Sequence, residues 1–71
     1  PEQARRLGLE GKVLLSFIVL ENGTTKEIKV MQSSGHALLD KSAKEAVALT
    51  RISRRTPYRV TVSLPITFRL Q

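Results

Sequence analysis

The amino-acid sequence predicts an α+β domain: a three-stranded antiparallel sheet in the order 2-1-3, with one main helix packed on one face and a short N-terminal helix. Three observations support this class. Two apolar runs flank Asn22-Gly23, an Ala-rich amphipathic segment follows them, and apolar and polar residues alternate from Val60 to Leu70. A chain of 71 residues makes one small domain, near the lower size limit for a self-sufficient core.

Residues 1–8 have the charge pattern of a short helix. Pro1 suits a first helical turn, Glu2 lies near the positive end of the helix dipole and Arg5-Arg6 near the negative end. Gly8 follows and marks the end of this predicted helix.

Asn22-Gly23 predicts a hairpin between strands at 12–20 and 24–32. We expect a two-residue type I′ turn, because this turn needs positive φ at both central residues. Such a turn places Glu21 opposite Thr24. The resulting pairs across the hairpin are Phe17 with Ile28, Leu15 with Val30, Ser16 with Lys29 and Ile18 with Glu27.

The two hairpin strands differ in polarity. Strand 12–20 is apolar on both faces, which is typical of a central strand. Strand 24–32 carries Lys26, Glu27 and Lys29, which is typical of an edge strand.

Ser33-Ser34-Gly35 ends the second strand, and Asp40 is a candidate N-cap for the helix that follows. The apolar stripe of this helix recurs at helical spacing and comprises Leu39, Ala43, Ala46, Val47 and Thr50. Residues 51–59 form a basic connection with Thr56-Pro57 as a helix breaker.

The last strand, Val60 to Leu70, reads as half-buried because its apolar residues alternate without interruption. A right-handed crossover from the second strand to a parallel third one passes over the first strand. This handedness gives the order 2-1-3.

The residues that carry enzyme chemistry are sparse. The chain has no cysteine, and His36 is its only histidine. Ser33, Ser34 and His36 lack a well-placed orienting acid, and Asp40 near His36 lacks a third metal ligand. We therefore interpret the chain as non-enzymatic, with no cofactor and no metal site, and His36 as a turn residue.

The net charge of +6 and pI near 10.6 suggest three kinds of partner: nucleic acid, an anionic membrane surface and an acidic protein. The basic loop Arg51–Arg59 has Tyr58 as its only aromatic residue, so a nucleic-acid site there competes with a solvated loop. Attraction to anionic lipid or to an acidic partner segment is the third interpretation. No nucleic acid is expected as the main partner.

Pro65 is informative because proline lacks an N–H and is confined to edges, strand starts and bulges. If its missing N–H points away from the sheet, the alternate residues of the strand also direct their backbone groups outward. The alternative is that Pro65 only blunts an edge against aggregation. The outward set comprises Thr61, Ser63, Pro65, Thr67 and Arg69.

The order and spacing of these signals resemble the C-terminal domain of TonB-type energy transducers. The matching positions are Gly11, Val13, Leu15, Phe17, Val19, Asn22-Gly23, Ile28, Val30, Ser33-Ser34-Gly35, Leu39-Asp40 and Ala43, with VSLPITFRL closing the chain. On this resemblance, residues 1–71 are one TonB-like C-terminal domain cut from a longer chain, and Pro1 is the remnant of the family's Tyr-Pro start.

The resemblance implies a periplasmic domain, anchored to the inner membrane in the full-length protein, that serves transport such as siderophore and iron uptake. It implies binding of TonB-dependent outer-membrane transporters by capture of their TonB box as an added β-strand, driven by the ExbB/ExbD motor through the missing N-terminal part. The implied partner-binding residues are Arg59, Thr61, Ser63, Pro65, Thr67 and Arg69. The open edge also predicts a homodimer of this fragment at high concentration.

One departure concerns the end of the main helix. The family usually follows it with a Trp-Arg-aromatic-x-Pro segment, whereas Thr50–Arg54 keeps only the arginine. Two alternatives stay open: a general periplasmic or secretion adaptor of the TolA type, and a basic nucleic-acid-binding domain.

Overall fold

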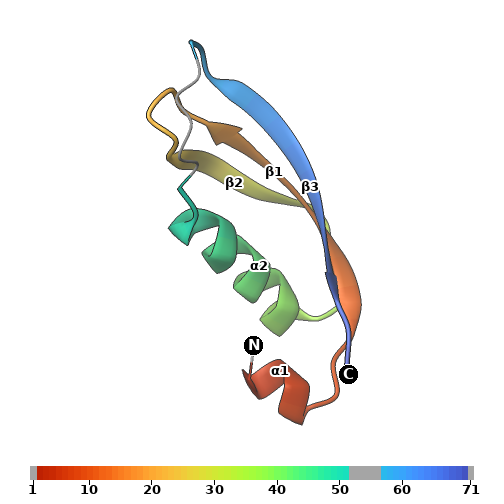
Figure 1. Cartoon of the computed structure of the whole chain (residues 1–71). Helices are drawn as coiled ribbons and strands as arrows, with labels where there is room; N and C mark the ends of the chain where they lie inside the picture. Colours follow the sequence, from red (N-terminus) through yellow and green to blue (C-terminus); the bar gives the residue numbers. More distant parts are fainter. Residues whose placement is uncertain (1, 52–56, 71) are drawn as a thin grey trace.

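The computed structural model of the chain describes residues 2–51 and 57–70. Its elements are α1 (Glu2–Arg6), β1 (Gly11–Val19), β2 (Thr25–Gln32), α2 (Ala37–Leu49) and β3 (Val60–Phe68). The strands form an antiparallel sheet in the order β2-β1-β3; α2 covers one face and α1 lies near one end of it (Figure 1). The predicted fold class is confirmed, including the strand order and the short N-terminal helix.

The turn between β1 and β2 differs from the prediction. Leu20 N donates to Thr24 O at 2.8 Å, and Gly23 N donates to Leu20 O at 2.9 Å. The loop therefore has three residues, and among its members only Gly23 has a positive φ, of 86°. These bonds are typical of a turn followed by a left-handed glycine. The predicted two-residue type I′ turn, with Glu21 opposite Thr24, is wrong, because Asn22 does not take the left-handed conformation that such a turn requires.

A bulge in β2 restores the predicted register beyond the turn. Glu27 has a φ of 53°, and the pairing shifts by one residue between Ser16 and Ile18. Ile18 consequently pairs with Lys26 and not with Glu27 as predicted, and Phe17 faces the bulge without the single partner predicted for it. Past the bulge, the predicted pairs Ser16 with Lys29 and Leu15 with Val30 are confirmed.

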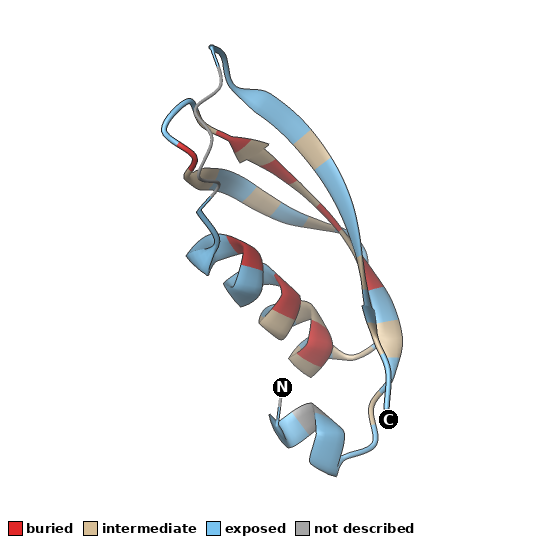
Figure 2. Cartoon of the chain, viewed as in Figure 1, coloured by how far each residue is buried: buried red, intermediate tan, exposed pale blue. Residues whose placement is uncertain are grey.

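The core lies between β1 and α2 (Figure 2). Its buried side chains are Val13, Leu15, Phe17 and Val19 from β1, and Leu39, Ala43 and Val47 from α2. Ile28 and Val30 of β2 pack against this cluster, and Thr25 Oγ1 donates to Val47 O at 3.0 Å. The predicted helical stripe is narrower than expected, since Ala46 and Thr50 are exposed.

The start of α2 also differs from the prediction. His36, not Asp40, is the N-cap, and it makes no side-chain capping bond. Asp40 lies in the first turn, where its carboxylate accepts hydrogen bonds from the hydroxyl of Ser33, from Ser34 N at 3.0 Å and from Ser34 Oγ at 2.7 Å. The Ser33 hydroxyl, followed by the Ser34 amide, lowers the pKa of Asp40 below its ordinary value of 3.8. Asp40 thus fastens the end of β2 to the helix.

β3 is less covered than predicted. The strand ends at Phe68, and the side chains that share its core-facing side include Val60, Leu64 and Leu70, with exposed fractions of 37%, 38% and 44%. The reason is the position of α2, which packs against β1 and β2. The central part of the predicted basic connection, residues 52–56, lies outside the described residues.

Candidate functional site

The backbone groups of β3 alternate between β1 and the outside of the sheet. Within one antiparallel strand, successive residues direct their hydrogen bonds to opposite neighbours. Leu20 bonds to the β2 side, so Val19 and every second residue before it bond to β3. Val19 pairs with Val60, and the pairing with β3 continues without a shift to Gly11 and Phe68. The β3 residues that direct their backbone outward are therefore Thr61, Ser63, Pro65 and Thr67.

The two edges of the sheet differ in how accessible they are. The outer edge of β2 carries exposed Lys26, Glu27 and Lys29, and its bulge at Glu27 interrupts the ladder. Charges and bulges are the devices by which proteins block an edge. The outer edge of β3 runs for nine residues with no register shift, and uncharged Thr61, Ser63 and Thr67 line it. β3 is thus the edge that a further strand can join.

Arg59 and Arg69 lie at opposite ends of this edge, immediately before and after β3. Both are exposed. The two ion pairs found among the described residues are intrahelical, Arg6 with Glu2 and Lys41 with Glu45, so neither flanking arginine is neutralised by them. All six predicted partner-binding residues therefore lie along one strand and its two flanks. That they bind a partner stays a prediction.

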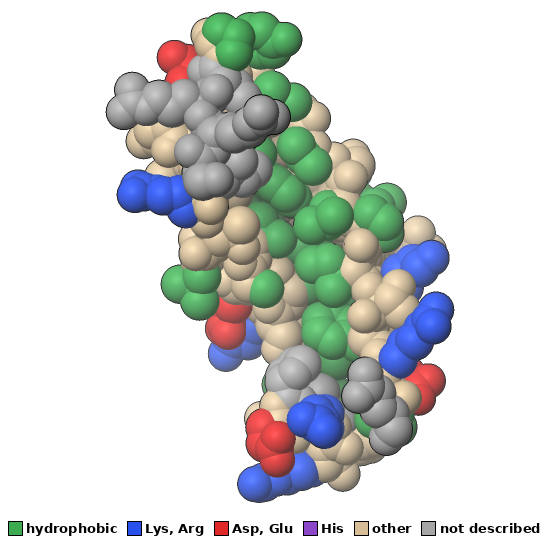
Figure 3. Space-filling model, viewed as in Figure 1, with side chains coloured by type: hydrophobic (Ala, Val, Ile, Leu, Met, Phe, Trp, Pro, Cys, Tyr) green, Lys and Arg blue, Asp and Glu red, His purple; other side chains and the backbone are tan. Residues whose placement is uncertain are grey.

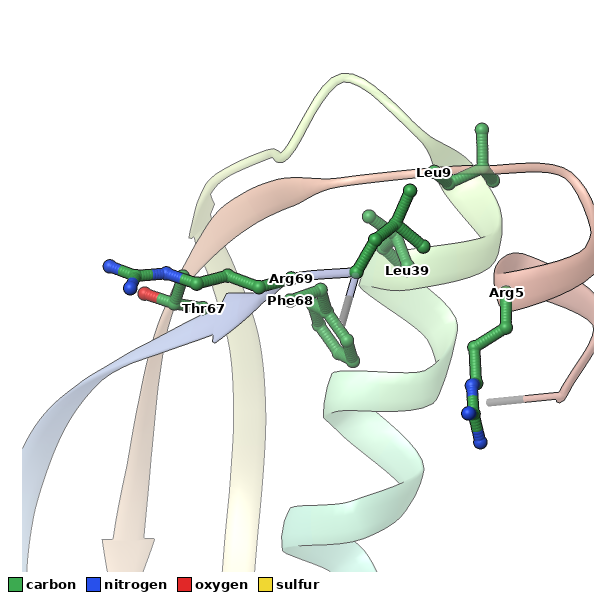
Figure 4. A pocket seen from close by; sticks show the side chains of 7 residues that line it. Arg5, Leu9, Leu39, Thr67, Phe68 and Arg69 are labelled. Carbon is green, nitrogen blue, oxygen red and sulfur yellow. The ribbon is translucent and has the colours of Figure 1, made fainter.

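A cleft of about 220 Å³ lies where α1 approaches the end of β3 (Figure 4). Arg5 and Arg69 belong to its lining, but their guanidinium groups point away from each other, and Arg69 extends beside Thr67. Leu39 and Phe68 lie between them. The cleft is consequently not built to hold an anion, and Arg69 is directed toward the edge of β3.

The serines near His36 serve the fold. The Ser33 and Ser34 hydroxyls both donate to Asp40. Among the described residues, the hydrogen bonds of His36 involve its backbone N–H and C=O and not its imidazole. A nucleophile and its base must contact each other, and this arrangement lacks that contact. Within the described residues, no three His, Cys, Asp or Glu side chains are grouped to hold a metal ion.

Sequence reasoning missed an apolar groove between α2 and β3. Hydrophobic side chains form a stripe along this face of the molecule (Figure 3). Two hollows open there, one bounded by Val62 and Leu64 and the other by Ile66 and Phe68. The signal available in the sequence is the number of helices: the apolar stripe of one main helix is too narrow to cover three strands.

Neither of the described helices is long and apolar enough to cross a membrane. The family model for the Gram-negative bacterial TonB protein C-terminal matches residues 1–70. Among curated relatives, TonB of Haemophilus influenzae is 36% identical over 73 residues, which takes in all of this chain and 27% of the relative. Protein tonB2 of Pseudomonas aeruginosa is 49% identical over 47 residues, 66% of this chain and 17% of the relative.

A solved structure gives the same relationship at the level of the fold. The solution structure of the TonB C-terminal domain of Helicobacter pylori is 32% identical, with a TM-score of 0.81, and the match covers all of this chain and 67% of that one. The chain thus spans about a quarter or less of the length of these full-length relatives. On the family match over residues 1–70 and on these relatives, this chain belongs to the TonB C-terminal domain family.

Proposed function

We propose that this domain is the periplasmic, non-catalytic protein-binding module of a TonB-type energy transducer. It captures the TonB box of an outer-membrane transporter as a strand added to β3. The observation that carries this proposal is the outer edge of β3, which is long, regular and uncharged, whereas the edge of β2 is charged and bulged. Family membership supports an outer-membrane transporter as the class of partner.

Affinity in such a complex comes from main-chain hydrogen bonds, since an added strand continues the ladder of the sheet. Thr61, Ser63 and Thr67 each offer an N–H and a C=O, and Pro65 offers a C=O alone. A peptide of about five to seven residues matches the length of an ordinary strand. Arg59 and Arg69 at the two ends attract acidic residues of the peptide.

In the full-length protein, the segments before this domain carry it from the inner membrane. The ExbB/ExbD motor drives those segments with proton-motive force, and this domain transmits the work to the transporter through the added strand. A strand held by several backbone bonds suits this task, because a load directed along the strand is shared among the bonds of the ladder.

The test is an NMR titration of the domain with a TonB-box peptide, tethered to the chain if affinity is weak. Amide shifts are expected to cluster from Thr61 to Arg69. Thr67→Pro removes an outward donor and should weaken binding about two- to twelvefold, the equivalent of one hydrogen bond of about 0.5–1.5 kcal/mol. Ile66→Pro is the matched control, because it deletes a donor to β1 and should destabilise the fold instead.

Two results would contradict the proposal. Shifts confined to residues 25–31 would place the peptide on the wrong edge. Shifts confined to the basic loop Arg51–Arg59 would favour an electrostatic site. A domain that ignores TonB-box peptides but binds a non-transporter protein at the same edge would be an adaptor of the TolA type.

The same open edge also favours pairing between two copies of the chain, because unpaired backbone groups of one β3 can join those of another. We expect a dimer at high concentration. Light scattering over a wide concentration range measures it, and a monomer throughout that range would count against the expectation.

A further inference from the structure

We propose that the groove between α2 and β3 contacts the side chains of the captured strand and selects peptides with an apolar residue at every second position. This inference rests on the proposed function, because the added strand brings those side chains to the groove. Main-chain bonding alone would accept any extended sequence.

The groove exists because α2 packs on β1 and β2 and leaves the core-facing side of β3 partly bare. Leu64 of β3 is 38% exposed and Leu49 of α2 is 87% exposed. Figure 3 shows that hydrophobic side chains form a stripe along this face of the molecule. Covering such a surface removes apolar area from water and therefore lowers the free energy.

Two hollows divide the groove along its length. The first holds about 220 Å³ and is lined by Phe17, Val19, Thr25, Val47, Thr50, Val62 and Leu64. The second holds about 380 Å³ and is lined by Ser42, Ala43, Glu45, Ala46, Leu49, Ile66 and Phe68. Both linings are mainly apolar, and neither includes a lysine or an arginine.

The spacing of the hollows matches the repeat of a strand. Their β3 walls, Val62–Leu64 and Ile66–Phe68, lie four residues apart, which is about 13 Å in an extended strand. An added strand beside β3 places every second side chain on the α2 side of the sheet, about 7 Å apart. Residues i and i+4 therefore lie next to the two hollows, and residue i+2 lies between them, beside Leu64 and Ile66.

The other side chains of the added strand face the opposite side of the sheet. There the outward set of β3 is polar except for Pro65, and Arg59 and Arg69 share its alternation. The selected occupant is an extended peptide with apolar residues at i, i+2 and i+4 and polar or acidic residues between them.

The experiment compares two seven-residue peptides in NMR titrations. One has Val at positions 2, 4 and 6 and Thr elsewhere; the other is all Thr, which has nearly the same shape and also favours strands. If each Val covers part of the groove, the alternating peptide should bind about 10- to 30-fold more tightly, or about threefold for each Val.

Two domain variants show where that preference arises. Ala46→Glu places a carboxylate over the second hollow and should reduce the discrimination to that of the first hollow, a loss of at least threefold. Ala48→Glu is the matched control: Ala48 is also exposed on α2 but does not line either hollow. It should leave the discrimination unchanged.

Three outcomes would overturn the inference. If the two peptides bind with equal affinity and both shift the amides of β3, the groove does not select the peptide, and the proposed function still stands. Equal loss in Ala46→Glu and Ala48→Glu assigns the effect to charge alone. Concentration-dependent shifts of groove residues without peptide, together with a doubled mass by light scattering, make a second copy the occupant. If neither peptide shifts any β3 amide, the proposed function itself fails.

Discussion

Replacing Glu27 by glycine should stabilise the domain, although glycine normally weakens a strand. Glu27 is exposed and has a φ of 53°, a conformation that costs an L-residue about 1–2 kcal/mol. Glycine avoids this cost but loses about 0.5–1 kcal/mol through the greater freedom of its unfolded chain. The expected net gain is about 0.5–1 kcal/mol, which raises the Tm of a domain of this size by about 2–8 °C.

The sign of this change tests the register of the hairpin. In a hairpin without the bulge, Glu27 would be extended, and glycine would destabilise it by about 0.5–1 kcal/mol. Lys29→Gly is the matched control, because Lys29 is exposed on the same strand and pairs regularly with Ser16; it should show that loss. Glu27→Gln isolates the effect of the charge. Thermal and urea unfolding measure all three variants, and equal losses in Glu27→Gly and Lys29→Gly would refute the bulge.

The remaining predictions concern single contacts of the fold. Gly23→Val should destabilise by more than about 1 kcal/mol, since Gly23 has a φ of 86°; unchanged urea unfolding would contradict this turn. Gly11→Ala should cost about 1–3 kcal/mol, because the new Cβ would lie 2.9 Å from Ser34 Cβ and 3.2 Å from Ser34 O; an unaltered Tm would count against this packing. Asp40→Asn should make the stability of the domain less dependent on pH in the acid range. Because the pKa of Asp40 is lowered in the folded state, the stabilisation by its carboxylate is present above pH 3.8 and is lost as pH falls through the folded-state pKa. Parallel stability–pH curves for the two proteins between pH 2 and 6 would exclude this contribution.

The hairpin shows which part of a structure periodicity can predict. The three-residue loop shifts the pairing by one residue relative to the predicted turn, and the bulge at Glu27 shifts it back. Leu15 therefore still meets Val30. The core alternation demands this outcome, because a one-residue slip would turn Ile28 and Val30 away from the helix. The three-residue turn and the bulge were not predicted, because Asn-Gly is compatible with both loop lengths.

The main helix was predicted from its period, but its lateral position on the sheet was not. Leu39, Ala43 and Val47 follow one another at intervals of four and are buried, as helical periodicity requires. Which strands they cover depends on the two connections that hold the helix. Asp40 fixes one end by accepting hydrogen bonds from the hydroxyls of Ser33 and Ser34 and from the Ser34 amide, and these local contacts leave no periodic signal in the sequence.

Pro65 gives the edge of β3 a preference between a peptide and a second copy of the chain. A peptide residue opposite Pro65 can donate its N–H to the proline carbonyl, so the ladder lacks one hydrogen bond. Two β3 edges that pair through their centres each bring a proline, so that ladder lacks two. At about 0.5–1.5 kcal/mol for each bond, the second missing bond favours the peptide by roughly two- to twelvefold at equal concentration. On the proposed function, Pro65 would limit self-association and keep the edge open to a foreign strand. The two interpretations of this proline are therefore compatible: it would disfavour pairing with a second copy and still allow a peptide to bind.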